Sequence, residues 1–271
     1  LLGVEPSVEV AQSKLTVIGP RLVKDTLSVL YWLLPQTRQS IAASIRSEFL
    51  NLGDPNIIRN VVAGSTQHSS TMLRNAYGMV AVADRYRVPL PIEVLVSPLD
   101  IDYGTWLESA KEACPVWGIL YSVDSEQNDG EYYRTRNSVI TDMLIETING
   151  GAMHRSGEVS ILTSLIQSCR DKTSTVYREF CIRLLVPGKR LEGLEYAQGI
   201  QLYDAAIASL SHPDQTLVHH KGLWIKNVGQ DPLLAITVLE EALHTQPYPY
   251  TDRPEAEEHI HTSLAAAWLG A

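Results

Sequence analysis

The succession of elements predicted between residues 71 and 150 limits the possible folds more than any other feature of the sequence. Apolar residues at helical spacing predict a first helix that ends near Arg87 and a second helix from Ile92 to Leu99. Two prolines separate these helices, because proline cannot continue a helical hydrogen-bond ladder. Asp102 is a suitable N-cap for a third helix. Three short helices in close succession are expected to share one core.

A predicted β-hairpin and a fourth helix follow. Residues 117–123 have the composition of a strand, Asn128-Asp129-Gly130 favours a tight turn, and residues 131–136 form the return strand. Apolar residues at helical spacing then continue to Ile148. Helix, helix, helix, hairpin, helix is the order of a winged-helix domain, in which the hairpin packs at the edge of the helical core. We expect this domain at residues 71–151.

Residues 152–271 carry helical patterns alone, so the fold is predicted to be mainly α. The last part has the spacing of tetratricopeptide-like repeats. The second helix of such a unit has small, large and small residues and then proline, as in Ala235, Leu239, Ala242 and Pro247. The preceding helix supplies Gly222 and Trp224, where two helices pack closely. Gly222 lies one residue too early for a standard unit, so we expect a slightly long turn at 228–232.

The charge of the chain argues against nucleic acid as a partner. The 271 residues carry a net charge of −9, whereas affinity for phosphate backbones comes from clustered Lys and Arg. The third helix would enter the DNA groove in a winged-helix protein. Lys111 is its one cation, against Asp100, Asp102, Glu108 and Glu112. Such a surface repels duplex DNA.

Cysteine usage and hydropathy predict a cytoplasmic protein without a membrane span. Cys114, Cys169 and Cys181 form no C-x-x-C pair, which is typical of reduced, buried thiols. No apolar run approaches the roughly 18 residues of a transmembrane helix. The first residues also lack the basic stretch that begins a signal peptide.

No catalytic, metal-binding or cofactor motif is predicted in this chain. The one Gly-Lys pair, Gly188-Lys189, is followed by Arg190 where a phosphate-binding loop needs Ser or Thr. His219 and His220 are adjacent, so their side chains diverge on a helix and are a poor metal pair. The chain alone is therefore not expected to be an enzyme.

Two arginines interrupt the acidic character of the hairpin. Arg134 and Arg136 fall on one face of the return strand. They are either a solvated pair or a contact to an acidic neighbouring domain or to a nucleotide phosphate. The residues themselves leave both interpretations open.

Three segments resemble prokaryotic STAND-type signalling NTPases. Residues 30–38 (LYWLLPQTR) look like a stretch found downstream of the ATPase core in those proteins. Residues 81–91 (AVADRYRVPLP) are similar to the start of their winged-helix domain. Residues 133–140 (YRTRNSVI) resemble the segment that ends the wing and begins the last helix.

The resemblance implies a regulatory role. In that family the winged helix packs on the nucleotide domain and holds the resting, ADP-bound state, while the repeats bind a trigger protein. Residues 1–70 would be a helical linker after an ATPase core that is absent from this chain. Asn137 lies where relatives often have a histidine near the nucleotide phosphates, and asparagine cannot carry a positive charge. ATP or ADP would bind to the parent protein.

The same resemblance implies that an activated protein forms a homo-oligomer, and a role in antiviral defence is expected because many prokaryotic relatives look like defence proteins. Two other functions fit the predicted elements. A transcriptional regulator with a helical ligand-binding domain would need a basic groove-facing surface. A plain repeat scaffold would bind partner peptides without any nucleotide switch.

Overall fold

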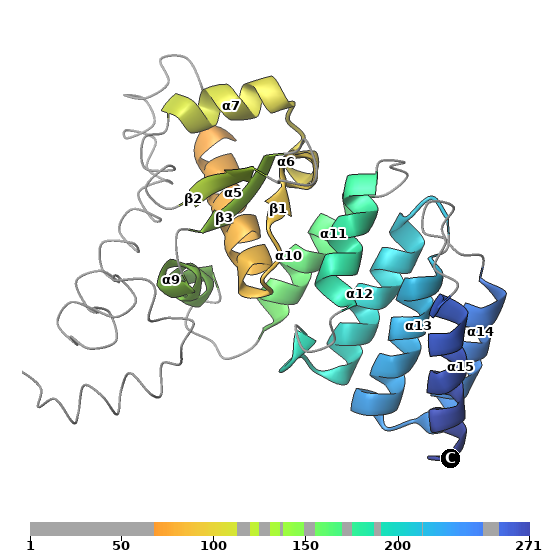
Figure 1. Ribbon diagram of the computed structural model, residues 1–271. Helices are drawn as coiled ribbons and strands as arrows, with labels where there is room; N and C mark the ends of the chain where they lie inside the picture. Colours follow the sequence, from red (N-terminus) through yellow and green to blue (C-terminus); the bar gives the residue numbers. More distant parts are fainter. Residues whose placement is uncertain are drawn as a thin grey trace, which may run out of the picture.

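The computed structural model describes residues 68–112, 120–124, 131–135, 138–148, 155–169, 175–186, 191–212, 214–245 and 255–271. The described residues are mainly helical, with one small antiparallel sheet (Figure 1). The helices predicted before residue 68 lie outside the described residues. Of the helices in the described ranges, none combines the length and the apolar character that crossing a bilayer requires.

The first part of the described chain, here called the hairpin unit, covers residues 68–148. Its elements are α5 (His68–Arg85), β1 (Leu90–Pro91), α6 (Ile92–Val96), the 3₁₀ helix η1 (Ser97–Leu99), α7 (Tyr103–Glu112), β2 (Leu120–Asp124), β3 (Glu131–Thr135) and α9 (Ser138–Ile148). This is the predicted order of three helices, a hairpin and a fourth helix. The second predicted helix is shorter than expected, because its last turn tightens at Ser97-Pro98 into η1.

The sheet has three strands, in the order β1-β3-β2, where two were predicted. Tyr133 of the central strand β3 pairs with Leu90 on one side and with Ser122 on the other. β1 is only two residues long, which is too short to show an alternating pattern in the sequence. Its second residue, Pro91, cannot donate a ladder hydrogen bond, which suits its place on an edge strand.

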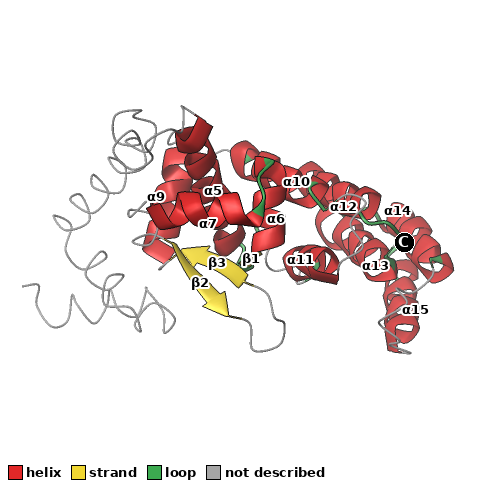
Figure 2. Cartoon of the chain, turned by 90° about the horizontal axis from the view of Figure 1, so that it is seen from above, coloured by secondary structure: helices red, strands yellow, loops and turns green. Residues whose placement is uncertain are grey.

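The second part of the chain, the helical array, covers residues 155–271. Its elements are α10 (Ser156–Gln167), α11 (Thr175–Leu185), α12 (Tyr196–Ser209), α13 (Gln215–Trp224), the π-helical turn η3 (Ile225–Gly229), α14 (Pro232–His244) and α15 (Glu255–Trp268). Figure 2 shows the array extending away from the hairpin unit. The Asp214 carboxylate caps α13 by accepting from two main-chain N–H groups, and Asp231 caps α14.

The turn predicted at 228–232 begins later than expected. Helical structure continues from Trp224 through η3 to Gly229, and the chain reverses only at Gln230, whose φ is +53°. A π-helical turn holds one residue more than an α-helical turn. The extra residue of this turn therefore accounts for the early position of Gly222, and the loop between the end of η3 and the start of α14 is short.

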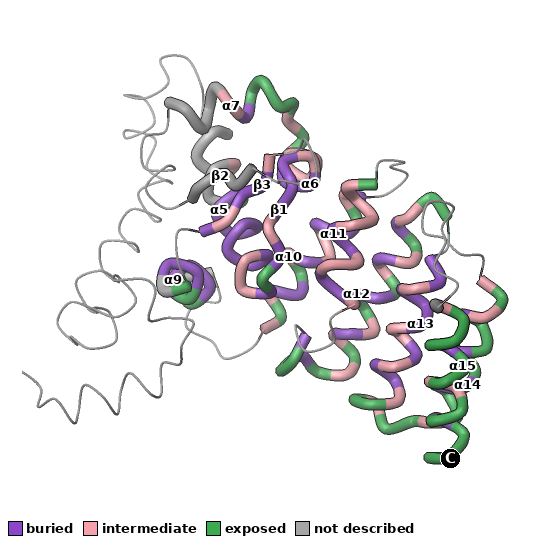
Figure 3. Tube along the Cα trace, in the orientation of Figure 1, coloured by how far each residue is buried: buried purple, intermediate pink, exposed green. Residues whose placement is uncertain are grey.

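A single apolar cluster connects the hairpin unit with the array. It runs from α5 into α12 and α13, and the stretches of the Cα trace coloured as buried in Figure 3 follow the same course. Its large fully buried members include Tyr77, Trp106, Leu162, Phe180 and Tyr203. The boundary predicted at residue 151 therefore does not coincide with a break in the core. The division into 71–151 and 152–271 stays a prediction.

Gly199 of α12 offers a test of this packing. A Cβ added there would lie 2.2 Å from Cε2 of Trp224, so the indole would have to move. We expect Gly199→Ala to lower the free energy of unfolding by about 1–3 kcal/mol, as overpacked cores do. Urea denaturation measures the change. Gly270→Ala is the matched control, since the nearest atom to its Cβ would be 3.6 Å away. Equal stability of both variants would contradict this packing.

Candidate functional site

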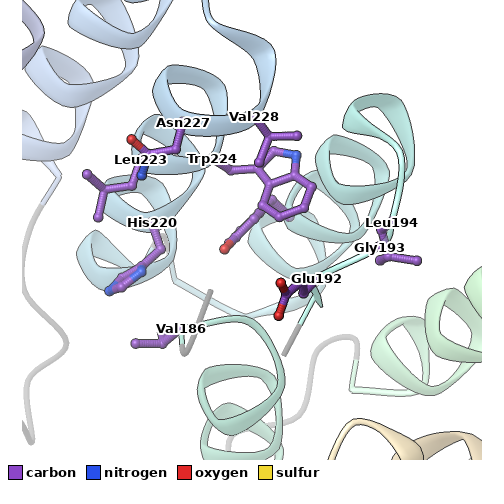
Figure 4. A pocket seen from close by; sticks show the side chains of 10 residues that line it. Val186, Glu192, Gly193, Leu194, His220, Leu223, Trp224, Asn227 and Val228 are labelled. Carbon is purple, nitrogen blue, oxygen red and sulfur yellow. The ribbon is translucent and has the colours of Figure 1, made fainter. Parts of the chain in front are cut away.

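A pocket of about 690 Å³ opens on the helical array, between the end of α11, the start of α12 and the α13–η3 segment (Figure 4). Its volume lies within the range of natural ligand pockets. The lining residues are Val186, Glu192, Gly193, Leu194, Tyr203, His220, Leu223, Trp224, Asn227 and Val228. They come from four separate segments of the chain, so tertiary packing assembles this array pocket.

The aromatic side chains of Trp224 and Tyr203 form the inner wall of the array pocket, and each donates a hydrogen bond to a main-chain oxygen. The indole Nε1 of Trp224 donates to the main-chain oxygen of Tyr196 at 3.1 Å. The hydroxyl of Tyr203 donates to the main-chain oxygen of Leu185 at 2.9 Å. The two ring centroids are 6.4 Å apart. Both rings are buried and each is held at its polar end by a hydrogen bond to the main chain.

The π-helical turn supplies one rim of the array pocket. Asn227 and Val228 belong to η3 and are exposed, and in Figure 4 both lie beside Trp224 at the edge of the pocket. π-helical turns occur mostly as single turns and frequently at functional sites. On the other rim, Gly193 has φ +86°, a left-handed conformation that favours glycine. The guanidinium of Arg155 packs there and donates to the main-chain oxygen of Glu192 at 2.9 Å.

The polar groups of the array pocket are hydrogen-bond acceptors or neutral. Glu192 is exposed and contributes a carboxylate. Burial lowers the pKa of His220, so its imidazole is neutral at pH 7 and one ring nitrogen can accept. Asn227 adds an amide oxygen. Of the ten described residues that line the pocket, none is Lys or Arg.

A second polar feature, the α5–α10 junction, connects the hairpin unit to the array. The carboxylate of Glu158 on α10 is 1% exposed. Arg85 Nε lies 3.2 Å from its Oε2, and the hydroxyl of Tyr86 donates to the same oxygen at 3.4 Å. Burial, and then the charge of Glu158, raise the pKa of Tyr86 to about 12, so the hydroxyl keeps its proton. A buried carboxylate needs such partners.

The structure describes one of the three predicted contact residues of the hairpin. Arg134 Nε pairs with Asp84 Oδ1 at 2.7 Å, and its side chain is 36% exposed. The other carboxylate oxygen of Asp84 accepts from Thr135 and Thr141, so α5, β3 and α9 meet at one group. Arg136 and Asn137 lie outside the described residues.

Most of the predicted repeat residues lie at helix contacts. A Cβ on Gly222 would come within 2.8 Å of Leu239, so α13 and α14 touch closely there. Ala235 and Ala242 are buried on α14, in a cluster with Val218 and Ile225. Trp224 packs on Gly199 and lines the array pocket. Pro247 lies outside the described residues.

Sequence reasoning missed Glu192, His220 and Asn227 as a group, and it missed Glu158. Nothing in a helical pattern relates the loop residue Glu192 to Asn227, because 35 positions separate them. Glu158 did carry a signal in the sequence, because it lies next to the apolar residue Val159 on the buried side of α10.

No family model, no curated protein and no solved structure matches the chain.

The α5–α10 junction predicts a stability effect. Glu158→Ala removes the buried carboxylate and leaves Arg85, which is 31% exposed, without this partner. We expect the free energy of unfolding to fall by about 2–3 kcal/mol, below the usual cost of breaking a fully buried pair because Arg85 reaches solvent. Glu179→Ala breaks the exposed pair with Arg183 and should cost under about 0.5 kcal/mol. If urea denaturation gave equal losses of unfolding free energy for the two variants, the α5–α10 junction would not contribute more than an exposed ion pair.

His219 predicts a pH dependence of stability. Its Nε2 lies 2.9 Å from Ser263 Oγ on α15, and burial, then His220 and His259, lower its pKa to about 4. An unfolded chain protonates this ring near pH 6.5. The contribution is therefore fully present above about pH 6.5 and is lost as the pH falls toward 4.

We expect a loss of about 1–2 kcal/mol across that window, because solvent reaches part of the ring. Urea denaturation at a series of pH values measures it. His219→Gln should flatten the profile between pH 6.5 and 4, whereas the exposed His212→Gln should not. An unchanged profile for His219→Gln would contradict the assignment.

Proposed function

We propose that this chain is the regulatory part of a STAND-type signalling NTPase. In this proposal residues 71–151 are a winged-helix domain and residues 152–271 are a tetratricopeptide-like array. The order α5, α6, α7, the β2–β3 hairpin and α9 supports the first assignment, together with the resemblance of residues 81–91 and 133–140. The antiparallel helices with a glycine contact at Gly222 support the second.

The observation that carries the proposal is the continuous connection between the two parts. One apolar cluster crosses from α5 to α13, and Glu158 adds a buried ion pair at the α5–α10 junction. A ligand that binds the array therefore acts on the same packed body as the hairpin unit. If two positions of that body on an ATPase domain differ in ligand affinity, the ligand shifts the balance between them.

The proposed contact edge toward the ATPase domain is Arg134, Arg136 and Asn137. Asp84 holds Nε of Arg134 and so orients the guanidinium, while part of the side chain reaches solvent. An oriented arginine suits a phosphate or a carboxylate on a neighbouring domain. ATP or ADP in the parent protein, a trigger protein on the array, oligomerisation after activation and a role in antiviral defence follow from the resemblance.

Charge disfavours the transcriptional regulator. Asp100 and Asp102, which precede α7, are exposed, and Glu131 on β3 accepts from the hydroxyls of Tyr103 and Tyr133. A DNA-binding helix needs cations at this position. The plain scaffold would not need the orientation that Asp84 imposes on Arg134.

Nucleotide release tests the proposal in the full-length protein. We expect Arg134→Ala to speed the release of a fluorescent ADP analogue about threefold to tenfold, since one charge-assisted contact is lost. Asp84→Asn is the matched comparison, because it weakens the same ion pair and keeps the guanidinium. Asp84→Asn should speed release less than Arg134→Ala, and unchanged release in Arg134→Ala would show that Arg134 does not contact the nucleotide domain. A full-length protein that binds neither ATP nor ADP would show the proposal to be wrong.

A further inference from the structure

The array pocket combines apolar rims with an acidic end. Leu223, Val228 and Val186 provide aliphatic surface around the opening, and Val228 is 41% exposed. In Figure 4 the carboxylate of Glu192 extends toward the space below Trp224. A side chain that enters here meets hydrocarbon along its length and an acceptor at its end.

The charges near the array pocket favour a cation as that end group. Glu192 carries the one formal charge among the ten lining residues, because His220 is neutral at pH 7. The amide oxygen of Asn227 is a further acceptor. Arg155, a described cation beside this rim, donates one N–H to the main-chain oxygen of Glu192 and packs against Gly193. The net charge of −9 also favours the approach of basic partners.

We propose that the array pocket binds a basic side chain, Arg or Lys, of a partner protein. The aliphatic stem packs against Leu223 and Val228 on one rim, and the cationic head bonds to the carboxylate of Glu192 on the other. Arg and Lys are the side chains that join a long apolar stem to a cation. The inference rests on the proposed function in one respect, since it identifies which surface of the array receives the trigger protein.

Three capped pentapeptides test the chemistry of the ligand. They have the sequence Gly-Ser-X-Ser-Gly, in which X is arginine, norleucine or glutamate. Binding is followed through the indole N–H resonance of Trp224 and the side-chain amide of Asn227 in NMR titrations of the whole chain. We expect the arginine peptide to bind most tightly, the norleucine peptide more weakly and the glutamate peptide not at all. The affinity of the arginine peptide should fall as salt is raised.

Two variants that each remove one carboxylate, one in the pocket and one outside it, test the role of the Glu192 charge. Glu192→Gln keeps the size of the side chain and should weaken the arginine peptide about threefold, the range of an exposed ion pair. Glu240→Gln, on the exposed face of α14, should leave the affinity unchanged. Unfolding midpoints of both variants show whether the fold is intact.

Three outcomes overturn the inference. One is equal affinity for the arginine and norleucine peptides. Another is tighter binding of the glutamate peptide, which would point to Lys189 and Arg190, the two cations that precede Leu191 in the sequence. The third is the absence of any saturable shift. Arginine binding that depends on Glu192, in a full-length protein that binds no nucleotide, would leave the pocket assignment standing and remove the proposed function.

Discussion

The buried carboxylate of Glu158 imposes the strictest condition on how the two parts of the chain meet. A charge taken out of water must find partners, and Glu158 finds them in Arg85, the last residue of α5, and in Tyr86, which follows it. Apolar contacts alone would tolerate some sliding of α10 along α5. An ion pair and a hydrogen bond to one oxygen atom restrict that sliding, because both donors must stay within bonding distance of it. The direction of the whole array relative to the hairpin unit depends on this register.

The order of the elements could be predicted from the sequence, and the reason is physical. Helices that bury one face have apolar residues at a regular spacing, and Pro89 and Pro91 separate the first two helices of the hairpin unit. The short strand β1 could not be predicted, because two residues show no periodicity and the strand exists only through its pairing with β3. The turn after α13 was placed too early for a related reason. A π-helical turn leaves no residue pattern beyond a one-residue offset.

The candidate site was less predictable than the fold. Trp224 was identified as a packing residue, and it does pack on Gly199, but its second role as a pocket wall depends on Tyr203 and on the loop that carries Glu192. Such neighbours come together only when distant segments fold. Arg134 was identified by its strand face, yet its partner Asp84 lies 50 residues earlier, on another element. Spacing along one element cannot show which carboxylate an arginine will meet.

The π-helical turn at Ile225–Gly229 is equivalent to one residue inserted into a regular helix. An α-helix turns about 100° per residue, so such an insertion rotates everything after it by more than a quarter of a circle unless the extra residue bulges locally. Here the extra residue bulges locally, so α14 still packs on α13, and the exposed residues Asn227 and Val228 form a rim of the pocket. A single codon gained or lost at this place could therefore create or erase the rim, while the helices on either side keep their contacts.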